Sequence, residues 1–361
     1  MSTTEPKGDS REMPATPPKL TDGTSTATLD AVGAMVSPRA RSARRIVASS
    51  PFYMSVVLFV LILTFSILAP DAFPTTANAR NVLLDASGLL VMATGMTFVM
   101  VAAGFDLSIG SVLVFAGVCS AKAMEALGTD NAFTVAAGLA VALLAGLGWG
   151  LFNGFCITRL RVPALITTLG SMGAALGFAR LITDGNDVRD VPLSLIRITT
   201  GSFLGLSWLV WVAVLVTVVG GLVLHFTRFG RYTYLIGSNA EAARRAGINV
   251  DRHLLYLYAL SGLLAGLAGM LSLTRFATTT IIGHSTDALQ VITAVVLGGT
   301  SLFGGVGSVI GTVVGVFIPA VLNNGFVVMN VEPFWQEVAI GFVLIVAVYI
   351  DQLKRRQRDR A

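Results

Sequence analysis

Few residues in this sequence have the type and spacing that enzyme chemistry needs. The three histidines, His225, His253 and His284, are scattered, and none belongs to an H-E-x-x-H helix or to a Cys/His cluster with metal-ligand spacing. Ser261 lacks the flanking glycine and the base that a serine nucleophile needs. No lysine lies in a G-x-x-x-x-G-K-[ST] phosphate loop. The sequence therefore predicts no metal or other cofactor, no ATP binding through such a loop and no intramembrane hydrolase.

The most polar internal stretch, Thr227–His253, has the chemistry of a docking surface instead. It contains five arginines in a protein in which 12% of residues are charged. Glu241–Ala246 consists of good helix formers, with Ser238 or Asn239 as its predicted N-cap and Gly247 as its predicted end. From the residues alone, this stretch is either a contact site for another protein or a solvated connector between two membrane helices.

A second polar break, Gly104–Ser111, joins two apolar runs and contains one acidic residue. A carboxylate at the centre of a membrane helix costs roughly 3 kcal/mol unless it is capped or hydrated. We interpret Asp106 as the N-cap of the next helix, with Ser108 as the alternative cap. The other interpretation is a role in a transport path. Gly298–Gly307 forms a similar Gly/Ser-rich break, which an ancient internal repeat would explain.

These polar sites must be positioned by membrane helices. The 361 residues are 54% hydrophobic, and the apolar runs are long enough to span a bilayer. The net charge is +5, but the basic residues gather at the ends of apolar runs, which indicates membrane topology rather than nucleic-acid binding. Cys119 and Cys156 lie inside apolar runs and are interpreted as small core residues.

We therefore predict an all-α integral membrane protein with about ten transmembrane helices. The predicted spans are Phe52–Ala69, Ser87–Gly104, Ser108–Leu127, Phe133–Ile157, Pro163–Ile182, Leu204–Phe226, Leu254–Leu273, Leu289–Leu302, Val306–Val328 and Phe334–Ile350. The eighth is short and rich in glycine, as broken helices that line cavities are.

Charge predicts that both termini are cytoplasmic. With ten spans, the basic stretches Arg159–Arg161, Thr227–His253 and 352–361 fall inside, and the neutral or acidic loops Pro70–Ala86 and Thr183–Phe203 fall outside.

The predicted domains are a disordered cytoplasmic tail over residues 1–50, a transmembrane domain over 51–351 and a basic cytoplasmic tail over 352–361. The first tail is too long and polar for an ordinary signal peptide, so the first apolar run is expected to stay as an anchor. The arginines before that run hold this end inside and attract anionic lipid, or else they form a regulatory docking tail.

Small residues recur at every fourth position of several spans and so share a helix face. They either pack helices together statically or form a sliding surface for alternating access. The stripes are Gly138, Ala142, Gly146, Gly150 and Gly154; Gly307, Gly311 and Gly315; Gly262 and Gly266; and Gly173 and Gly177.

Four runs resemble one family of membrane proteins. They are Glu241-Ala242-Ala243 followed by Gly247, and the runs Gly104–Ser111, Leu297–Gly305 and Leu322–Gly325. Together they resemble the permeases of ATP-binding-cassette (ABC) importers, in the branch that takes up ribose, xylose, galactose and autoinducer-2. The likeness extends from Pro51 to Asp351.

The resemblance implies that the chain is not itself an enzyme and that it translocates a small polar solute, most simply a monosaccharide. The implied partners are a cytoplasmic ABC ATPase, an extracytoplasmic solute-binding protein, and a second permease copy or a sister chain. The implied location is a bacterial inner membrane. The implied site residues are Glu241, Ala242, Ala243 and Gly247 for ATPase coupling; Asp106, Ser108, Gly110, Ser111, Gly298, Gly299, Asn323 and Asn324 for the family motifs and a pathway; and Gly146, Gly150, Gly307 and Gly311 for helix packing.

Two other functions stay open on the sequence. An ion-driven secondary transporter would need ionisable residues in mid-span. The sequence instead places Lys122, Glu125, Arg180 and Glu337 near predicted span ends. A non-transporting membrane scaffold would use the Thr227–His253 stretch only as an interaction site.

Overall fold

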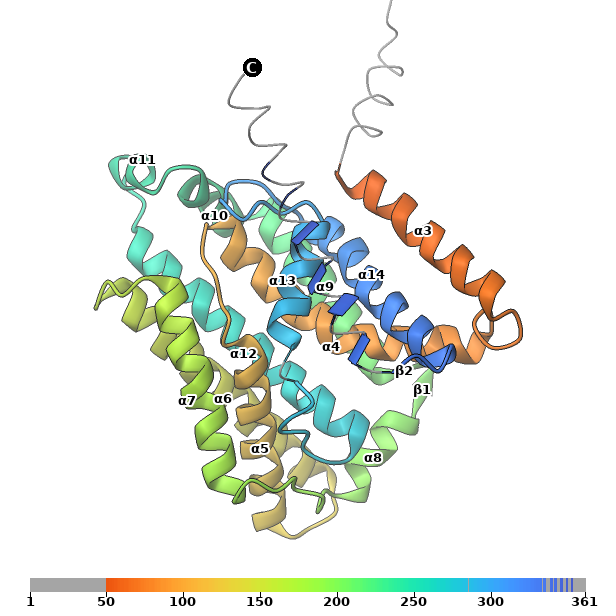
Figure 1. Ribbon diagram of the computed structural model, residues 1–361. Helices are drawn as coiled ribbons and strands as arrows, with labels where there is room; N and C mark the ends of the chain where they lie inside the picture. Colours follow the sequence, from red (N-terminus) through yellow and green to blue (C-terminus); the bar gives the residue numbers. More distant parts are fainter. Residues whose placement is uncertain are drawn as a thin grey trace, which may run out of the picture. The chain divides into compact units, whose positions relative to one another are not determined.

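The protein is described by a computed structural model that covers residues 50–284 and 286–332, together with 334–335, 338–339, 341–342, 345–346, 349 and 352 (Figure 1). The chain divides into two compact units, Met1–Ala48 and Ser49–Ala361, and the described residues all belong to the second unit. The predictions for the tail 1–50, for Glu337 and for the basic end therefore fall almost wholly outside the described residues.

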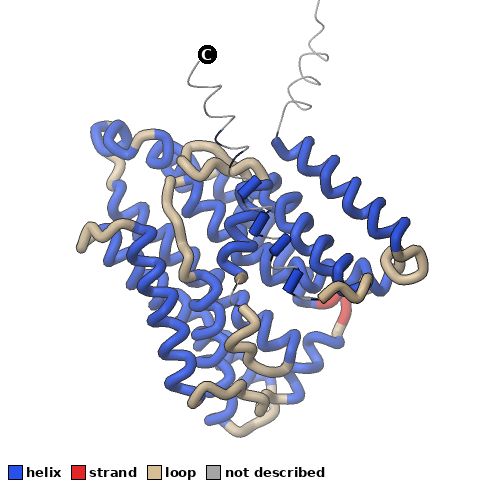
Figure 2. The backbone as a smooth tube through the Cα atoms, viewed as in Figure 1, coloured by secondary structure: helices blue, strands red, loops and turns tan. Residues whose placement is uncertain are grey.

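The described part is helical with one small hairpin, which confirms the predicted all-α fold. The two strands found in it, β1 (Ser202–Phe203) and β2 (Leu206–Ser207), pair antiparallel (Figure 2). The helices are α3 (Ser50–Leu68), α4 (Thr76–Val101), α5 (Ile109–Leu127), α6 (Ala132–Thr158), α7 (Ala164–Thr183), α8 (Leu193–Thr200), α9 (Trp208–Phe226), α10 (Arg228–Ser238), α11 (Ala240–Arg245), α12 (Val250–Phe276), α13 (Asp287–Leu297) and α14 (Val309–Val328).

Seven of these helices, α4, α5, α6, α7, α9, α12 and α14, are long and apolar enough to cross a membrane. The shorter apolar helices α3 and α13 correspond to the first and eighth predicted spans. The tenth predicted span, Phe334–Ile350, is described only in part. The chain is therefore a multi-pass membrane protein whose helices fit the predicted pattern of about ten spans.

Helices α4 and α12 form the centre of the bundle. Of their most apolar windows, 72% in α4 and 67% in α12 are buried within the protein, compared with 22% in α6 and in α9. The outer helices α3 and α9 expose large apolar side chains along their length, such as Phe59, Ile67, Leu215 and Leu222. In a membrane protein such exposed apolar faces suit contact with lipid.

Glycines bring α6 and α12 into direct backbone contact. A Cβ atom added at Gly146 would overlap the carbonyl oxygen of Gly262, and one added at Gly150 would overlap the carbonyl oxygen of Tyr258. Only glycine allows two helices to approach this closely. The predicted small-residue stripe of α6 is therefore a packing face.

Gly262 and Gly266 of α12 form the facing side of this contact, and the remaining two predicted stripes divide between packing and exposure. Gly311 of α14 lies against the carbonyl of Gly298, where a Cβ would again overlap it. Gly307 precedes α14 and lies against Thr300, with no room for a side chain. Gly173 and Gly177 of α7, by contrast, have nothing within 4 Å of an added Cβ. The α7 pair therefore packs against nothing in the described part of the chain.

Two stretches between predicted spans contain more secondary structure than the sequence predicts. Thr183–Phe203 includes α8 and β1, and the following span starts at Trp208 rather than Leu204, because Ser207 pairs in β2 and caps α9. Thr227–His253 contains α10 and α11, and α12 begins at Val250 rather than Leu254. Helix α10 was not predicted, because its buried residues Gly230, Thr233 and Ile236 do not form an apolar pattern in the sequence.

Candidate functional site

Helix α11 has both ends capped as the sequence predicts. At its start, the side chain of Asn239 accepts a 2.9 Å hydrogen bond from the amide of Ala242. At its end, Gly247 has φ of 83°, and its N–H donates to the carbonyl of Arg244 at 2.9 Å. The next amide along the chain donates to the carbonyl of Ala243 at 3.1 Å, which completes a Schellman motif. The segment therefore has a defined shape that a partner can recognise.

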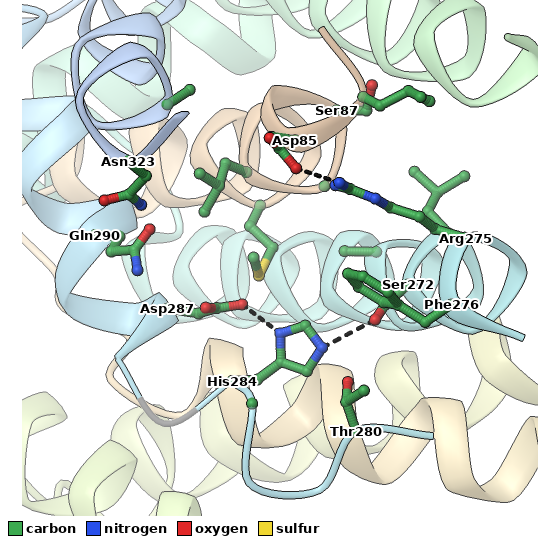
Figure 3. A pocket seen from close by; sticks show the side chains of 18 of the residues that line it. Asp85, Ser87, Ser272, Arg275, Phe276, Thr280, His284, Asp287, Gln290 and Asn323 are labelled. Atoms are coloured by element: carbon green, nitrogen blue, oxygen red, sulfur yellow. Dashed lines mark hydrogen bonds and ion pairs between the residues drawn. The ribbon is translucent and has the colours of Figure 1, made fainter. Parts of the chain in front are cut away.

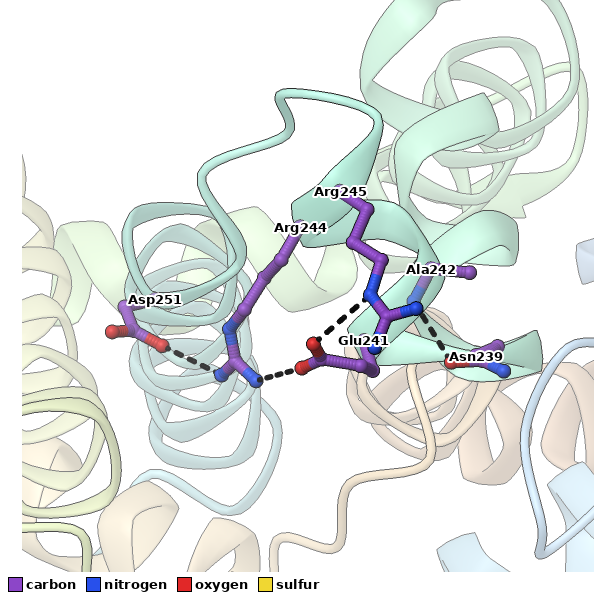
Figure 4. Close-up of polar contacts among 6 residues, drawn as sticks. All are labelled: Asn239, Glu241, Ala242, Arg244, Arg245 and Asp251. Atoms are coloured by element: carbon purple, nitrogen blue, oxygen red, sulfur yellow. Dashed lines mark hydrogen bonds and ion pairs between the residues drawn. The ribbon is translucent and has the colours of Figure 1, made fainter.

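Charged side chains cover the outer surface of this helix (Figure 4). Arg245 donates to Glu241 at 3.4 Å, and Arg244 lies 3.8 Å from Glu241 and 3.2 Å from Asp251. These four side chains are between 50% and 80% exposed, so each pair contributes less than about 1 kcal/mol to stability. Their main effect is to present a fixed pattern of charge to whatever lies outside the helix.

Ala243 points toward the rest of the chain and not toward the open surface of α11. It is 4% exposed and packs against Ile236 of α10 and Val250 of α12. Ala242 and Glu241, the other two residues of the Glu-Ala-Ala run, are exposed. One small residue of the run therefore anchors α11 to α10 and α12, and the second lies on the open surface.

Helix α10 connects this surface to the glycine-rich segment between α13 and α14. The hydroxyl of Tyr234 donates to the carbonyl of Gly307 at 2.8 Å. Burial raises the pKa of the Tyr234 phenol, which keeps this donor protonated. The amide of Gly305 donates to the carbonyl of Val101 at 2.8 Å, and a Cβ at Gly237 would overlap that same carbonyl. The backbone at the C-terminal end of α4 therefore packs directly against the backbones of α10 and the glycine-rich segment.

The predicted residues Gly298 and Gly299 lie at the start of this segment. Gly298 is the C-cap of α13, and Gly299 has φ of 90°, a conformation that favours glycine. They turn the chain and pack α13 on α14.

Asp106 is buried in a hydrogen-bonded cluster and does not cap α5, so its predicted N-cap role is wrong. Ser108 holds the N-cap position, and its side chain makes no cap hydrogen bond. Asp106 is 2% exposed; its Oδ1 accepts from the amide and hydroxyl of Ser108 at 3.1 and 2.6 Å, and its Oδ2 accepts from the hydroxyl of Ser261 at 2.6 Å. Asn153 donates to the Ser108 hydroxyl at 2.8 Å. This Asp106 cluster (Asp106, Ser108, Asn153 and Ser261) ties α6 and α12 to the start of α5.

The neighbouring predicted residues Gly110 and Ser111 lie in the first turn of α5. Gly110 is buried, and a Cβ there would lie 3.1 Å from the carbonyl oxygen of His284. Ser111 is half-buried. Gly110 therefore allows the loop between α12 and α13 to pack on α5.

The two asparagines of the Leu322–Gly325 run have different contacts. Asn324 is buried, and its side-chain amide exchanges two hydrogen bonds of 2.9 Å with Asn78 of α4. Asn323 borders a cavity of about 580 Å³. Asn324 lines the same cavity, so both asparagines border it and Asn324 in addition joins α14 to α4.

That cavity lies among α4, α12, α13, α14 and the loop between α12 and α13 (Figure 3). Arg275 of α12 forms an ion pair with Asp85 of α4 at its border. On another side, His284 Nδ1 lies 2.7 Å from Asp287, and His284 Nε2 lies 2.9 Å from the hydroxyl of Ser272. The cavity therefore has a polar lining made by elements that are distant in sequence.

The Ser272–His284–Asp287 chain has the connectivity of a hydrolase triad but not its setting. Ser272 lies inside α12, where backbone amides are already bonded to the preceding turn. Backbone donors that would hold an oxyanion are therefore not free beside Ser272. The two hydrogen bonds of His284 instead fix the loop between α12 and α13 to both helices.

The family model described as "Branched-chain amino acid transport system / permease component" matches residues 78–348. The chain belongs to this family. It is 36% identical over 304 residues to the ribose import permease protein RbsC of Escherichia coli (strain K12), covering 83% of this chain and 93% of the relative. It is 37% identical over 308 residues to the L-arabinose transport system permease protein AraH of the same strain, covering 84% and 91%. RbsC of Bacillus subtilis (strain 168) is 36% identical over 299 residues, covering 82% and 91%. No solved structure matches the chain.

The resemblance to ABC importer permeases is thereby confirmed, and the chain is a membrane permease subunit rather than an enzyme. Every residue of the Asp106 cluster, of the cavity border and of α11 lies inside the matched range. Most of the cavity lining could not be predicted from the sequence. His284 and Asp287 stand three residues apart, a spacing that could have drawn attention to them, but Asp85 and Arg275 are 190 residues apart and nothing in the sequence pairs them.

Proposed function

We propose that this permease imports a monosaccharide as the membrane-spanning part of an ABC importer. Its relatives named for ribose and L-arabinose are 36% and 37% identical over most of both chains, which supports a sugar as the solute. The sequence has no phosphate loop, so ATP hydrolysis would belong to a separate cytoplasmic ATPase.

The observation that carries the coupling part of this proposal is the exposed face of α11. A capped helix bearing Glu241, Ala242, Arg244 and Arg245 on its open side offers an ATPase a rigid, charged docking surface. Its inner side is anchored by Ala243, so a force on α11 would reach α10 and α12.

The contacts of α10 extend this path into the membrane. Tyr234 and Gly237 contact the glycine-rich segment and the end of α4, and Gly298 and Gly311 hold α13 against α14. In the proposed mechanism, closure of the ATPase would move α11 and α10 as a unit and shift α13 and α14 relative to α4. Such coupling requires two conformations of the permease, and nucleotide binding must change their relative populations.

We further propose that the permease works as a pair, with a second copy or a sister chain, and receives its solute from an extracytoplasmic binding protein. The proposed location is a bacterial inner membrane with α11 on the cytoplasmic side. The basic residues of Thr227–His253 and the acidic residues of the loop near Asp187 support this orientation. Reporter fusions near Asp187 and at Gly247 should report outside and inside; an external Gly247 would contradict the orientation.

The test of the whole proposal is uptake by proteoliposomes that contain the permease, its ATPase and its binding protein. Uptake of D-ribose or L-arabinose should require ATP inside the vesicle and should persist when ionophores collapse ion gradients. Uptake that needs an ion gradient and ignores ATP would instead establish an ion-coupled secondary transporter.

A further inference from the structure

We propose that the hairpin β1–β2 is a lipid anchor (Figure 2), which inserts the side chains of Phe203, Leu204 and Trp208 among the headgroups and upper acyl chains of the bilayer. This inference goes beyond the proposed function, because it assigns a partner to a surface that the proposed transport mechanism does not use. The partner is the membrane leaflet on the α8 side of the protein. With α11 on the cytoplasmic side, this is the outer leaflet.

The turn of this hairpin contains a residue that its backbone does not favour. Phe203 pairs with Leu206, so the turn consists of Leu204 and Gly205, whose φ angles are 53° and 76°. Two-residue turns with positive φ at both positions favour Asn-Gly or Asp-Gly, and a leucine adopts this region only at a conformational cost. Leu204 is 77% exposed, so packing within the chain does not offset that cost. Strain kept at an exposed apolar residue points to a contact outside the chain.

Aromatic side chains fix this turn to the start of α9. The rings of Phe203 and Trp208 stack with their centroids 5.7 Å apart and their planes at 16°. The ring of Trp211 lies 5.8 Å from that of Phe203, and its Nε1 donates to the carbonyl of Phe203 at 3.0 Å. Phe203 and Trp208 are nevertheless about half exposed, at 51% and 47%. The hairpin and the first turn of α9 therefore present one continuous apolar surface outward.

This surface continues the lipid-facing stripe of α9. Trp208, Leu215, Leu222 and Phe226 follow one another at intervals of seven, seven and four residues, so they share one face of the helix. All four are exposed, as the lipid-facing side chains of a membrane helix are. Phe203 stacks on Trp208 and extends the stripe beyond the start of the helix. A bilayer that covers the stripe along α9 therefore reaches Phe203 as well.

The length of α9 places its start at the membrane interface. Its 19 residues extend about 28 Å at 1.5 Å per residue, close to the roughly 30 Å of the hydrocarbon core. Trp208 and Phe226, at the two ends of α9, therefore lie near the two boundaries of the core. Tryptophan is enriched at this depth. Because the hairpin directly precedes Trp208, it lies at the same boundary.

The charges around the hairpin fit this position. The sequence contains no Asp, Glu, Lys or Arg between Arg197 and Arg228, so neither the hairpin nor α9 carries such a charge. A Cβ added at Gly205 would lie 3.2 Å from Nη2 of Arg80, which places a guanidinium of α4 beside the turn. A long basic side chain at the membrane interface can reach lipid phosphates while apolar neighbours contact acyl chains. An uncharged apolar tip with a cation beside it is therefore complementary to anionic lipid.

The first test measures the environment of Leu204 directly. Leu204→Cys is introduced into the full-length permease together with Cys119→Ser and Cys156→Ser, which remove both native cysteines. The protein is labelled with an environment-sensitive fluorophore and reconstituted, without a binding protein, in vesicles of phosphatidylethanolamine and phosphatidylglycerol. The emission should shift to the blue. Lipids that carry a nitroxide near the top of their acyl chains should quench it, and aqueous iodide should not.

The matched control is Asp190→Cys in the same background. Asp190 is exposed in the loop before α8, and a charged residue stays in water. Its label should be quenched by iodide and not by the nitroxide lipids. A Leu204 label that behaves like the Asp190 label would overturn the anchor. Shielding of the Leu204 label only after a solute-binding protein is added would also overturn it and would assign the hairpin to that protein.

The second test separates the leucine side chain from the turn. Asparagine suits a positive φ better than leucine, so Leu204→Asn improves the turn and removes its apolar tip. In a hairpin with only a structural role, this change would slow amide hydrogen exchange over residues 201–207 or leave it unchanged. In a lipid anchor, exchange in the same vesicles should become about tenfold faster, because the loss of one leucine contact with lipid favours local opening by that order.

Ser202→Asn is the control for the second test, because it exchanges one polar side chain for another at an exposed position of β1. Its exchange should match that of the wild type. Thermal unfolding in detergent should be unchanged in both variants, which separates lost lipid contact from misfolding. Exchange in Leu204→Asn that is equal to the wild type or slower would overturn the anchor, whichever solute the permease transports.

Discussion

Ser261 of α12 donates a 2.6 Å hydrogen bond to Asp106, a residue 155 positions earlier that lies in the turn before α5. On the same stretch of α12, Gly262 makes backbone contact with Gly146 of α6. Where α5, α6 and α12 meet, a hydrogen bond to a buried carboxylate therefore lies beside a direct backbone contact between two glycines. The first holds the turn before α5 in place, and the second requires that α6 and α12 stay close.

Removal of the Asp106 carboxylate should destabilise the permease. Asp106→Ala leaves two hydroxyl groups and one amide without their acceptor, at a cost of about 2–4 kcal/mol. Asp106→Asn keeps the shape and one carbonyl acceptor, and Ser261 can rotate to accept from the new amide, so the effect should be smaller. Thermal unfolding in detergent would measure both. Equal stability of the alanine variant and the wild type would show that the cluster is not structurally important.

Glycine contacts between helices should not tolerate a side chain. Gly146→Leu and Gly311→Leu should abolish accumulation of folded permease, because each Cβ would overlap a backbone carbonyl of the facing helix. Gly173→Leu, on the open face of α7, should leave the abundance of the single chain unchanged. Membrane abundance and size-exclusion profiles would separate the three variants. Normal profiles for Gly146→Leu and Gly311→Leu would mean that the facing backbones are not in direct contact at these glycines.

The sequence predicts most spans because apolar length is a local property. Span ends were displaced where a capping residue, such as Ser207 before α9, starts a helix within an apolar run. Helix α10 was missed because its stability comes from packing against α4 and the glycine-rich segment, which are far away in sequence. Local pattern alone does not contain that information.

In the candidate site, too, local features could be predicted from the sequence, whereas contacts with distant segments could not. Asn239 and Gly247 were predictable as caps of α11, since capping depends on a few consecutive residues. The inward direction of Ala243 was not, because it depends on where Ile236 and Val250 lie. Asp106 was assigned to the nearest helix start, whereas its second oxygen bonds Ser261 on a helix much later in the chain.

The two alanines of the Glu-Ala-Ala run should respond differently to a charge. Ala243→Asp places a carboxylate against Ile236 and Val250, where an unpaired buried charge is strongly unfavourable, so membrane abundance should fall. Ala242→Asp places the same group on the exposed face, so abundance should be normal and ATPase co-purification weak. Quantitative blotting of membranes and of the purified complex would test this. Loss of abundance in both variants, or normal docking in Ala242→Asp, would contradict the assigned faces.

Gly247 is the position at which coupling should be lost without loss of the membrane domain. Its φ of 83° is strained for a β-branched residue, whereas asparagine tolerates this region. Gly247→Val should therefore misplace the turn after α11, and Gly247→Asn should largely preserve it. An added Cβ meets nothing within 4 Å, so the cause would be backbone conformation and not a clash. We expect Gly247→Val to insert normally, to retain little ATPase and to lose uptake, with Gly247→Asn close to wild type. Full uptake and full ATPase retention in Gly247→Val would reject α11 as the coupling helix.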